Sequence, residues 1–337
     1  LSGAAGAQPL ITQPIGFAAR ETYPYYFSRQ GSVGDINGDG LPDLVADTTI
    51  GLCTWFSAGT GGFQDPVCDL HNGALLPSAT TLIDLNRDGK LDRIYISESA
   101  MYINLGNGDG TFQPTTKIPN VHPTTVWMTV ADLNGDGVPD LAAVNALGVQ
   151  ILAGNGDGTF TSYSVVNISS ATFIQAIPLR AGGRPDLVVF SLAGMTIIPN
   201  NSTGATHSLP AATAPVPCNY PVASAVADFN GDGLPDLAIG CVTPATVAVY
   251  LSNGLGGLNL TSTVHPFGVI TAVAAGDVNG DGLVDIVAAG GSDSVFVLPG
   301  NGAGQFKVAT SYTVNGGPEW VALADLRGIG RLDIVSA

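Results

Sequence analysis

The sequence has 337 residues, a length that allows two or three ordinary domains or one large repetitive domain. Charged residues make up only 11% and hydrophobic residues 45%, while 45 glycines and 22 prolines fall short of the content typical of disordered chains. This composition excludes a chain that is disordered throughout, and the lack of an apolar run of about 18 residues excludes a membrane-spanning helix. The net charge of −16 argues against nucleic acid as a partner, because nucleic acid attracts basic surfaces.

The acidic residues are unusual in kind, since 24 are Asp and only 3 are Glu. Asp favours turns and metal-binding loops over helices, so an all-β chain is expected. The chain begins at Leu1 rather than Met, which fits the removal of a leader, although simple trimming would look the same.

One acidic segment recurs along nearly the whole chain. Its first position falls at residues 35, 84, 132, 178, 228, 277 and 325, so that seven units follow each other at steps of 46 to 50 residues. Each unit predicts four short strands: an apolar run before the acidic segment, a β-branched run after it, a third strand, and a fourth strand. A turn of the form Asn-Gly-x-Gly-x-Phe precedes the fourth strand, and its phenylalanine is expected to open that strand, as at Asn107–Phe112, Asn155–Phe160 and Asn301–Phe306.

Four antiparallel strands repeated seven times predict a seven-bladed β-propeller of four-stranded antiparallel blades. A linear solenoid is the alternative, but solenoid repeats are usually shorter and lack two hairpins per unit. We assign residues 17–337 to the propeller and residues 1–16 to a separate N-terminal segment.

The acidic segment, Asp-x-Asn-Gly-Asp-Gly-x-x-Asp, has the ligand pattern of a calcium loop. Positions 1, 3, 5 and 9 supply side-chain oxygens, the carbonyl of position 7 adds another, and the glycines let the backbone curl around an ion. Five such loops in register argue against ordinary Asp-rich turns. Their predicted ligands are Asp35, Asn37, Asp39, Leu41 and Asp43; Asp84, Asn86, Asp88, Lys90 and Asp92; Asp132, Asn134, Asp136, Val138 and Asp140; Asp228, Asn230, Asp232, Leu234 and Asp236; and Asp277, Asn279, Asp281, Leu283 and Asp285.

The fourth and seventh loops depart from this pattern in the same way. Their third and seventh positions are Arg180 and Arg184 in one loop, and Arg327 and Arg331 in the other. We therefore expect a guanidinium to replace the ion, pairing with Asp186 in the fourth unit and with Asp325 or Asp333 in the seventh. Five bound calcium ions would also account for most of the negative charge.

These loops, each followed by an Asp-Leu-x-x strand, resemble the FG-GAP/VCBS repeat family, whose best-known members are the propellers of integrin α-subunits. Some fungal lectins share the seven-bladed form. The resemblance implies calcium ions with a structural role in the loops between the first and second strands of each blade. It does not imply one ligand, because the family includes adhesion proteins, sugar-binding proteins and domains accessory to enzymes.

The four cysteines predict two local disulfides, Cys53–Cys68 and Cys218–Cys241, which would indicate an oxidising compartment; free buried thiols are the alternative. Other candidates favour structural roles. The histidines His71, His122, His207 and His265 show no metal or triad spacing. Trp127 and Trp320 precede the first loop Asp by five residues, and we expect them to pack at one mouth of the central channel, with stacking on a sugar ring as the alternative. A second candidate contact surface is the aromatic cluster Tyr23, Tyr25, Tyr26 and Phe27, and glycosylation sequons occur at Asn167, Asn200, Asn201 and Asn259.

The expected function is that of a secreted, calcium-stabilised structural or adhesion module without enzymatic activity. The alternatives are a carbohydrate-binding lectin and, third, a polysaccharide-active enzyme. The expected partners are protein or glycan ligands at the cell surface, or further copies of the chain. The chain ends after two strands of the seventh unit, and Leu10–Thr12 with Phe17–Pro24 would supply the other two. Closure within one chain and head-to-tail donation of this segment to a neighbour, which would build filaments, both stay open.

Overall fold

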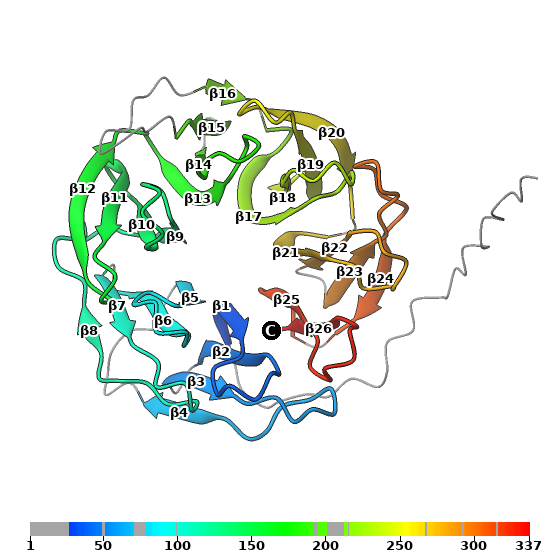
Figure 1. Ribbon diagram of the computed structural model, residues 1–337. Coiled ribbons are helices and arrows are strands. Elements are labelled where there is room, and N and C mark those ends of the chain that lie inside the picture. Colours follow the sequence, from blue (N-terminus) through cyan, green and yellow to red (C-terminus); the bar gives the residue numbers. More distant parts are fainter. Residues whose placement is uncertain are drawn as a thin grey trace, which may run out of the picture.

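The computed structural model describes residues 27–48, 51–70, 79–98, 100–191, 194–200, 212–214, 216–266, 268–290, 293–314 and 316–337. These residues form an all-β protein without helices, and the sheets stand side by side around a ring (Figure 1). Within each sheet the strands follow chain order and are antiparallel. This arrangement is a β-propeller, as the repeats predict.

The strands of the first three blades have the following bounds. The first blade is β1 (Phe27–Gly34), β2 (Asp43–Thr48), β3 (Gly51–Trp55) and β4 (Val67–Leu70). The second is β5 (Ala79–Ile83), β6 (Asp92–Ser97), β7 (Ala100–Asn104) and β8 (Thr116–Lys117). The third is β9 (Trp127–Ala131), β10 (Asp140–Asn145), β11 (Gly148–Gly154) and β12 (Phe160–Val166).

The remaining strands belong to the fourth to seventh units. The fourth blade is β13 (Ala171–Ile177), β14 (Asp186–Ser191), β15 (Gly194–Ile198) and β16 (Ala212–Ala214). The fifth is β17 (Asn219–Ala227), β18 (Asp236–Thr243), β19 (Thr246–Ser252) and β20 (Leu258–Val264). The sixth is β21 (Ile270–Gly276), β22 (Asp285–Gly290), β23 (Ser294–Leu298) and β24 (Thr310–Thr313), and the seventh unit has β25 (Val321–Ala324) and β26 (Asp333–Ser336).

The prediction of seven four-stranded blades is therefore wrong for the described residues: six blades have four strands, and the seventh unit is a two-stranded sheet. The segments expected to supply its other strands, Leu10–Thr12 and Phe17–Pro24, lie outside the described residues. The aromatic cluster Tyr23, Tyr25, Tyr26 and Phe27 has no described side chain either, nor do His71 and His207. The seventh unit nevertheless lies in the ring, between the sixth blade and the first (Figure 1).

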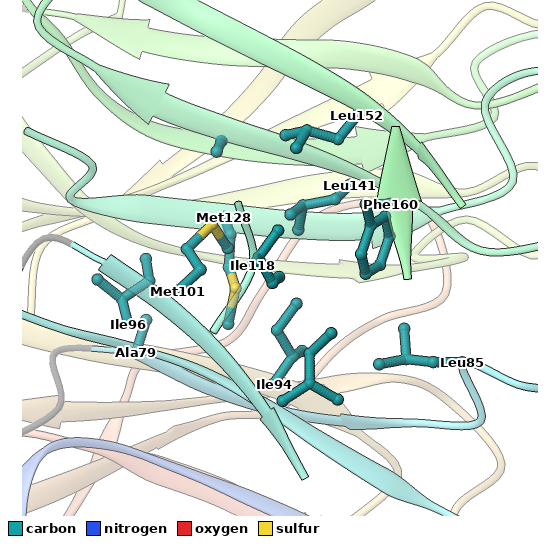
Figure 2. Packing of buried hydrophobic residues seen from close by; sticks show 12 residues of the cluster. Ala79, Leu85, Ile94, Ile96, Met101, Ile118, Met128, Leu141, Leu152 and Phe160 are labelled. Carbon is teal, nitrogen blue, oxygen red and sulfur yellow. The ribbon is translucent and has the colours of Figure 1, made fainter. Parts of the chain in front are cut away.

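The core lies between neighbouring blades rather than at the centre of the ring. In the six four-stranded blades, the second strand begins with six buried residues in a row, because both of its faces are covered by adjacent blades. Figure 2 shows one such layer, in which Ile94 and Met101 of the second blade pack against Met128 and Leu141 of the third. Burial of these faces supplies the main driving force for folding.

The ring closes through the seventh unit. Trp320 and Val335 of this unit pack in one cluster with Leu44 and Trp55 of the first blade. The Ser57 hydroxyl also donates a hydrogen bond of 3.0 Å to the carbonyl of Leu326. The first and last units are therefore in direct contact within this chain.

The outer strands differ from the prediction. Phe160 opens β12 as expected, but Phe112 and Phe306 form only isolated bridges, to Gly106 and Gly300, before short fourth strands begin. In the second blade, Pro114 follows soon after Phe112 and lacks the N–H that a strand ladder needs.

Candidate metal-binding loops

Each predicted calcium loop connects the first strand of a blade to the second, for example β1 to β2 at residues 35–42. The backbone curls tightly within the loop, with positive φ angles of 77° at Gly38 and 85° at Gly40. Only a residue that tolerates the left-handed region fits there without strain, which explains the glycines of the motif.

The first loop Asp organises this turn. Asp35 accepts N–H bonds at 2.7 Å from Gly38 and at 2.9 Å from Gly40, and Asp39 in turn accepts one from Leu41 at 2.8 Å. Equivalent bonds recur at Asp84, Asp132, Asp228 and Asp277. The five complete loops therefore share one conformation, with half-buried carboxylates at position 1 and exposed carboxylates at position 5.

The last Asp of each loop has a different environment, because it is the first residue of the buried second strand. Asp43 is fully buried and accepts backbone N–H bonds from Ile36 at 3.0 Å and from Ser57 at 2.9 Å, which link the loop to the end of the third strand. Burial raises the pKa of the Asp43 carboxyl above its ordinary value, partly offset by these two bonds. Burial raises the pKa in the same way at Asp92, Asp140, Asp236 and Asp285.

The donor set of these loops fits calcium. Calcium prefers six to eight hard oxygen ligands, and each loop offers three carboxylates, one Asn carboxamide and the carbonyl of position 7. In the described part of the chain, however, no three His, Cys, Asp or Glu side chains converge as a preformed metal cage. Ion binding would therefore exchange some of the N–H bonds to these acids for ligation.

In the fourth and seventh loops, an arginine side chain pairs with the last Asp of the loop, at position 9. The Arg180 guanidinium forms an ion pair with the buried Asp186 in the fourth blade. In the seventh unit, Arg327 donates to both Asp333 oxygens, at 2.7 and 3.2 Å. The expectation that a guanidinium pairs with the acid of these loops is confirmed, and in the seventh loop its partner is Asp333 rather than Asp325.

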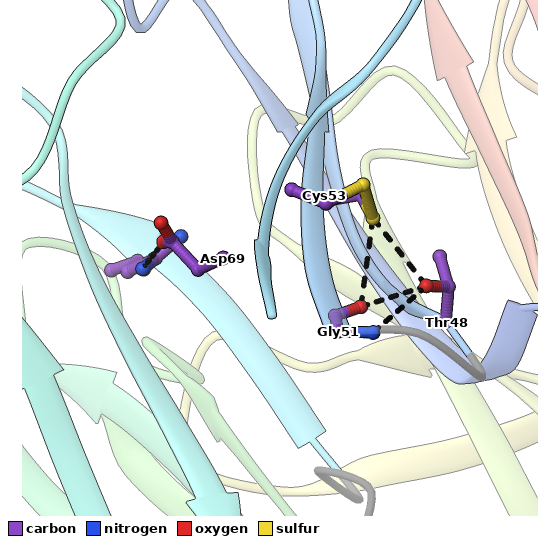
Figure 3. Close-up of a disulfide and its surroundings, with 6 residues drawn as sticks. Thr48, Gly51, Cys53 and Asp69 are labelled. Atoms are coloured by element: carbon purple, nitrogen blue, oxygen red, sulfur yellow. Dashed lines mark hydrogen bonds and ion pairs between the residues drawn. A yellow bond between two sulfur atoms is a disulfide. The ribbon is translucent and has the colours of Figure 1, made fainter. Parts of the chain in front are cut away.

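The predicted disulfides are confirmed. Cys53 and Cys68 face each other across β3 and β4, and Cys218, just before β17, bonds to Cys241 within β18. Figure 3 shows Cys53 beside Thr48 and Gly51, where the Thr48 hydroxyl donates a 2.8 Å bond to the Gly51 carbonyl. Each disulfide joins segments of one blade.

The tryptophans and the described histidines make packing and local contacts. The Trp127 ring centroid lies 4.5 Å from that of Phe173 in the next blade, and Trp320 is 9% exposed. The ring nitrogens of His122 and His265 lie within hydrogen-bond distance of Thr124 and Thr246, at 2.9 and 3.1 Å. These contacts agree with the structural roles expected for them.

One polar site, at Arg93, is not among the residues predicted from the sequence. Arg93 follows the last loop Asp in the second unit, where every other unit has Leu or Ile, and it lines a cleft between the first and second blades. The sequence signal was this single departure from the repeat.

The repeats match those of a known protein family. A family model described as FG-GAP-like repeat matches residues 84–143, 132–179, 228–288 and 277–336. A search among curated proteins found no match to the sequence.

Solved structures share the ring architecture. An Agrocybe aegerita lectin, described as recognising non-reducing terminal N-acetylglucosamine, is 20% identical with a TM-score of 0.63, and the match covers 90% of this chain and 84% of the lectin chain. BBS1N, solved in complex with ARL6DN, is 17% identical with a TM-score of 0.60 over 91% of this chain and 92% of its own. Saccharomyces cerevisiae Sqt1 is 14% identical with a TM-score of 0.58, over 93% and 95%.

At these identities the structural likeness shows the fold alone. The family model, in contrast, spans more than half of the sequence and includes four of the five complete loops. The chain belongs to the FG-GAP-like repeat family.

Proposed function

We propose that this chain is an extracellular β-propeller that is stabilised by five calcium ions and serves as a structural or adhesion module, not as an enzyme. The observation that carries the proposal is the contrast between two kinds of loop. Where the oxygen ligands are lost, a guanidinium lies against the buried acid, as Arg180 does at Asp186. Where the ligands are complete, no arginine stands at position 3, and a dication would supply the positive charge.

Calcium removal is the experiment that tests this proposal. A ligand that binds only the folded state stabilises it by about 2.7 kcal/mol per site at a hundredfold excess over its Kd. Several such sites together rival the total stability of a typical fold, about 5–15 kcal/mol. We therefore expect chelation with EDTA to lower the melting temperature by more than about 10 °C. An unchanged melting curve would refute the proposal.

Matched variants make the test specific to the complete loops. Asp132 and Asp325 both occupy position 1, but only the first stands in a complete loop. In a titration with terbium as the calcium mimic, the unaltered protein should bind five ions, Asp132→Asn four, and Asp325→Asn five. Binding of six or more ions would contradict the role assigned to the arginine loops.

The extracellular location is supported by the two disulfides, since such bonds persist in oxidising compartments. Among the described residues, none forms a helix with the length and hydrophobicity that a membrane crossing requires. Calcium at millimolar concentration outside cells suits modest-affinity loops of this kind. Fractionation of the native host would test the location, and detection of the protein only in the cytoplasm would contradict it.

Carbohydrate binding is the second candidate function. It is favoured by the polar cleft at Arg93 and is in keeping with the sugar-binding activity of the Agrocybe aegerita lectin. A glycan array distinguishes the two candidates, because a purely structural module should retain no glycan. A polysaccharide-active enzyme ranks third, and release of reducing ends from polysaccharides would be its evidence.

A further inference from the structure

The second blade breaks the packing rule of the other blades at one cross-strand pair. In β6 and β7, Arg93 stands opposite Asn104. The corresponding pairs of the other four-stranded blades are Leu44–Trp55, Leu141–Leu152, Leu187–Ile198, Leu237–Tyr250 and Ile286–Leu298. A guanidinium and a carboxamide thus replace large hydrophobic side chains. Burying a charge is costly unless it is paired and hydrogen-bonded, so this exchange requires partners for the guanidinium.

The charge is held by groups from two blades. The Arg93 side chain is only 4% exposed, and it forms an ion pair with Asp69 of β4, in the first blade. Its Nε donates to Asn104 Oδ1 at 2.9 Å, and its guanidinium carbon lies 4.3 Å from the centroid of the Phe112 ring. Asn104 in turn donates to the Gln113 carbonyl at 2.9 Å and to the Thr115 hydroxyl at 2.8 Å. The guanidinium is therefore fixed in place rather than mobile.

Asp69 is the accessible half of this pair. Its side chain is 65% exposed, and Figure 3 shows it directed away from β3 and toward the neighbouring blade. The two residues line a cleft of about 390 Å³ together with Phe112 and Gln113. Small-molecule sites in proteins have volumes of roughly 300–1,000 Å³, so the cleft is large enough for a small ligand.

The chemistry of the cleft selects a neutral ligand rich in hydroxyl groups. An anionic ligand would meet the exposed Asp69 carboxylate, and a metal ion would meet the Arg93 guanidinium, so neither charge is favoured. The Asp69 carboxylate, the Arg93 guanidinium and the exposed Gln113 carboxamide offer acceptors and donors, while the half-buried Phe112 ring offers an apolar wall. A sugar ring combines these properties, because its hydroxyls both donate and accept and its C–H groups are apolar.

We propose that the cleft between the first and second blades binds one neutral saccharide unit, and that the propeller carries a single site of this kind. Sugar hydroxyls donate to Asp69 and accept from Arg93 and Gln113. The site is single because the Arg–Asn pair occurs in only one of the six four-stranded blades. This inference rests on the second candidate function above and names its site and its valency.

The test uses methyl glycosides of glucose, galactose, mannose and N-acetylglucosamine as probes, at saturating calcium. Saturation-transfer NMR detects binding, and calorimetry of the best probe gives affinity and stoichiometry. We expect one site per chain in the unaltered protein. The double variant Arg93→Leu/Asn104→Leu, which copies the Leu141–Leu152 pair of the third blade, should weaken binding at least tenfold. It should still fold, because it restores the hydrophobic pair found in the third blade and leaves only the solvent-exposed Asp69 without its ion-pair partner.

Two single substitutions at exposed positions test the site with little effect on folding. Asp69→Asn should weaken binding at least tenfold, whereas Asp65→Asn, in the exposed connection that precedes β4, should leave it unchanged. The proposal is overturned if no glycoside binds the unaltered protein, if the double variant binds equally well, or if more than one site is found. A failure of the calcium proposal is separate, since it would appear as an unchanged melting curve in EDTA whether or not a glycoside binds.

Discussion

Position 4 of the loops has a left-handed backbone, which favours glycine. In the second loop this position is an arginine, Arg87. Gly38, Gly135, Gly231 and Gly280 have φ angles between 75° and 80° there, whereas the second loop has Arg87 with φ of 63°. The left-handed region costs a residue with a Cβ about 1–2 kcal/mol. The second loop therefore carries strain that its counterparts avoid.

Substitutions at position 4 should change the free energy of unfolding in opposite directions in these two kinds of loop. Arg87→Gly should raise the free energy of unfolding by about 0.5–1 kcal/mol, since relief of strain exceeds the added entropy of the unfolded chain. Gly231→Ala should lower it by about 1 kcal/mol, because a Cβ at Gly231 meets no atom within 4 Å and only the backbone is strained. Urea unfolding at fixed calcium concentration measures both. Equal signs for the two variants would contradict the argument.

Tyr250 gives the molecule a pH dependence on the alkaline side. Its side chain is 2% exposed, and burial raises its pKa to about 12. The unfolded chain ionises near its ordinary pKa of about 10, so the folded state binds this proton more tightly. The resulting stability is fully present below pH 10 and is lost as the pH rises toward 12.

We therefore expect the free energy of unfolding to fall between pH 10 and 11.5, and to fall less in Tyr250→Phe, which cannot ionise. Urea unfolding at a series of pH values measures this difference. Tyr220→Phe is the control, since Tyr220 is 59% exposed and should follow the unaltered protein. Parallel profiles for Tyr250→Phe and the unaltered protein would contradict the expectation.

Among the structural elements, the arginine loops test whether a side chain replaces an ion. Arg180→Met should lower the free energy of unfolding by about 3 kcal/mol, because it leaves the fully buried Asp186 carboxylate without its cation. Calcium should not rescue the variant, since positions 1 and 5 of this loop are Pro178 and Gly182. Urea unfolding with and without calcium measures both effects.

A second change identifies the cause of this loss. Adding Asp186→Asn removes the charge but keeps an acceptor for the N–H of Asn200, which now bonds to Asp186. The double variant should therefore be more stable than Arg180→Met alone. A loss below about 1 kcal/mol in the single variant would show that the ion pair contributes little.

The repeated inner strands could be predicted from the sequence, whereas the lengths of the outer strands and the contacts between blades could not. The second strands of the six four-stranded blades begin with a loop Asp and are buried on both faces, so they show similar apolar runs, apart from Arg93 in the second unit. The fourth strands are outermost, and β8 keeps only Thr116–Lys117. The cleft at Arg93 was missed because its partner Asp69 lies in the preceding unit, 24 residues away. Only the packing of blades brings the two together.

At the scale of the whole molecule, the seventh unit differs from the others in its burial. Strand β26 is only partly buried along its length, whereas the second strands of the other blades are buried. Of the described residues, none forms a further strand beside it, and its sheet ends at β26. A free strand edge with an uncovered face favours pairing with another segment. Two occupants fit: the N-terminal residues of the same chain, or those of a second copy.

Deleting residues 1–15 distinguishes these two arrangements. If the segment completes the seventh blade of its own chain, the variant should stay monomeric and melt at a lower temperature, because the edge and face of β26 become exposed. If the segment is donated to a neighbour, the unaltered protein should form head-to-tail polymers, and the variant should be a monomer of unchanged thermal stability. Light scattering after size-exclusion chromatography gives the mass, and calorimetry gives the melting temperature. A synthetic peptide of residues 1–24 should restore the lost stability in the first case. Unchanged mass and unchanged melting temperature together would exclude this segment as the partner of β26 in either arrangement.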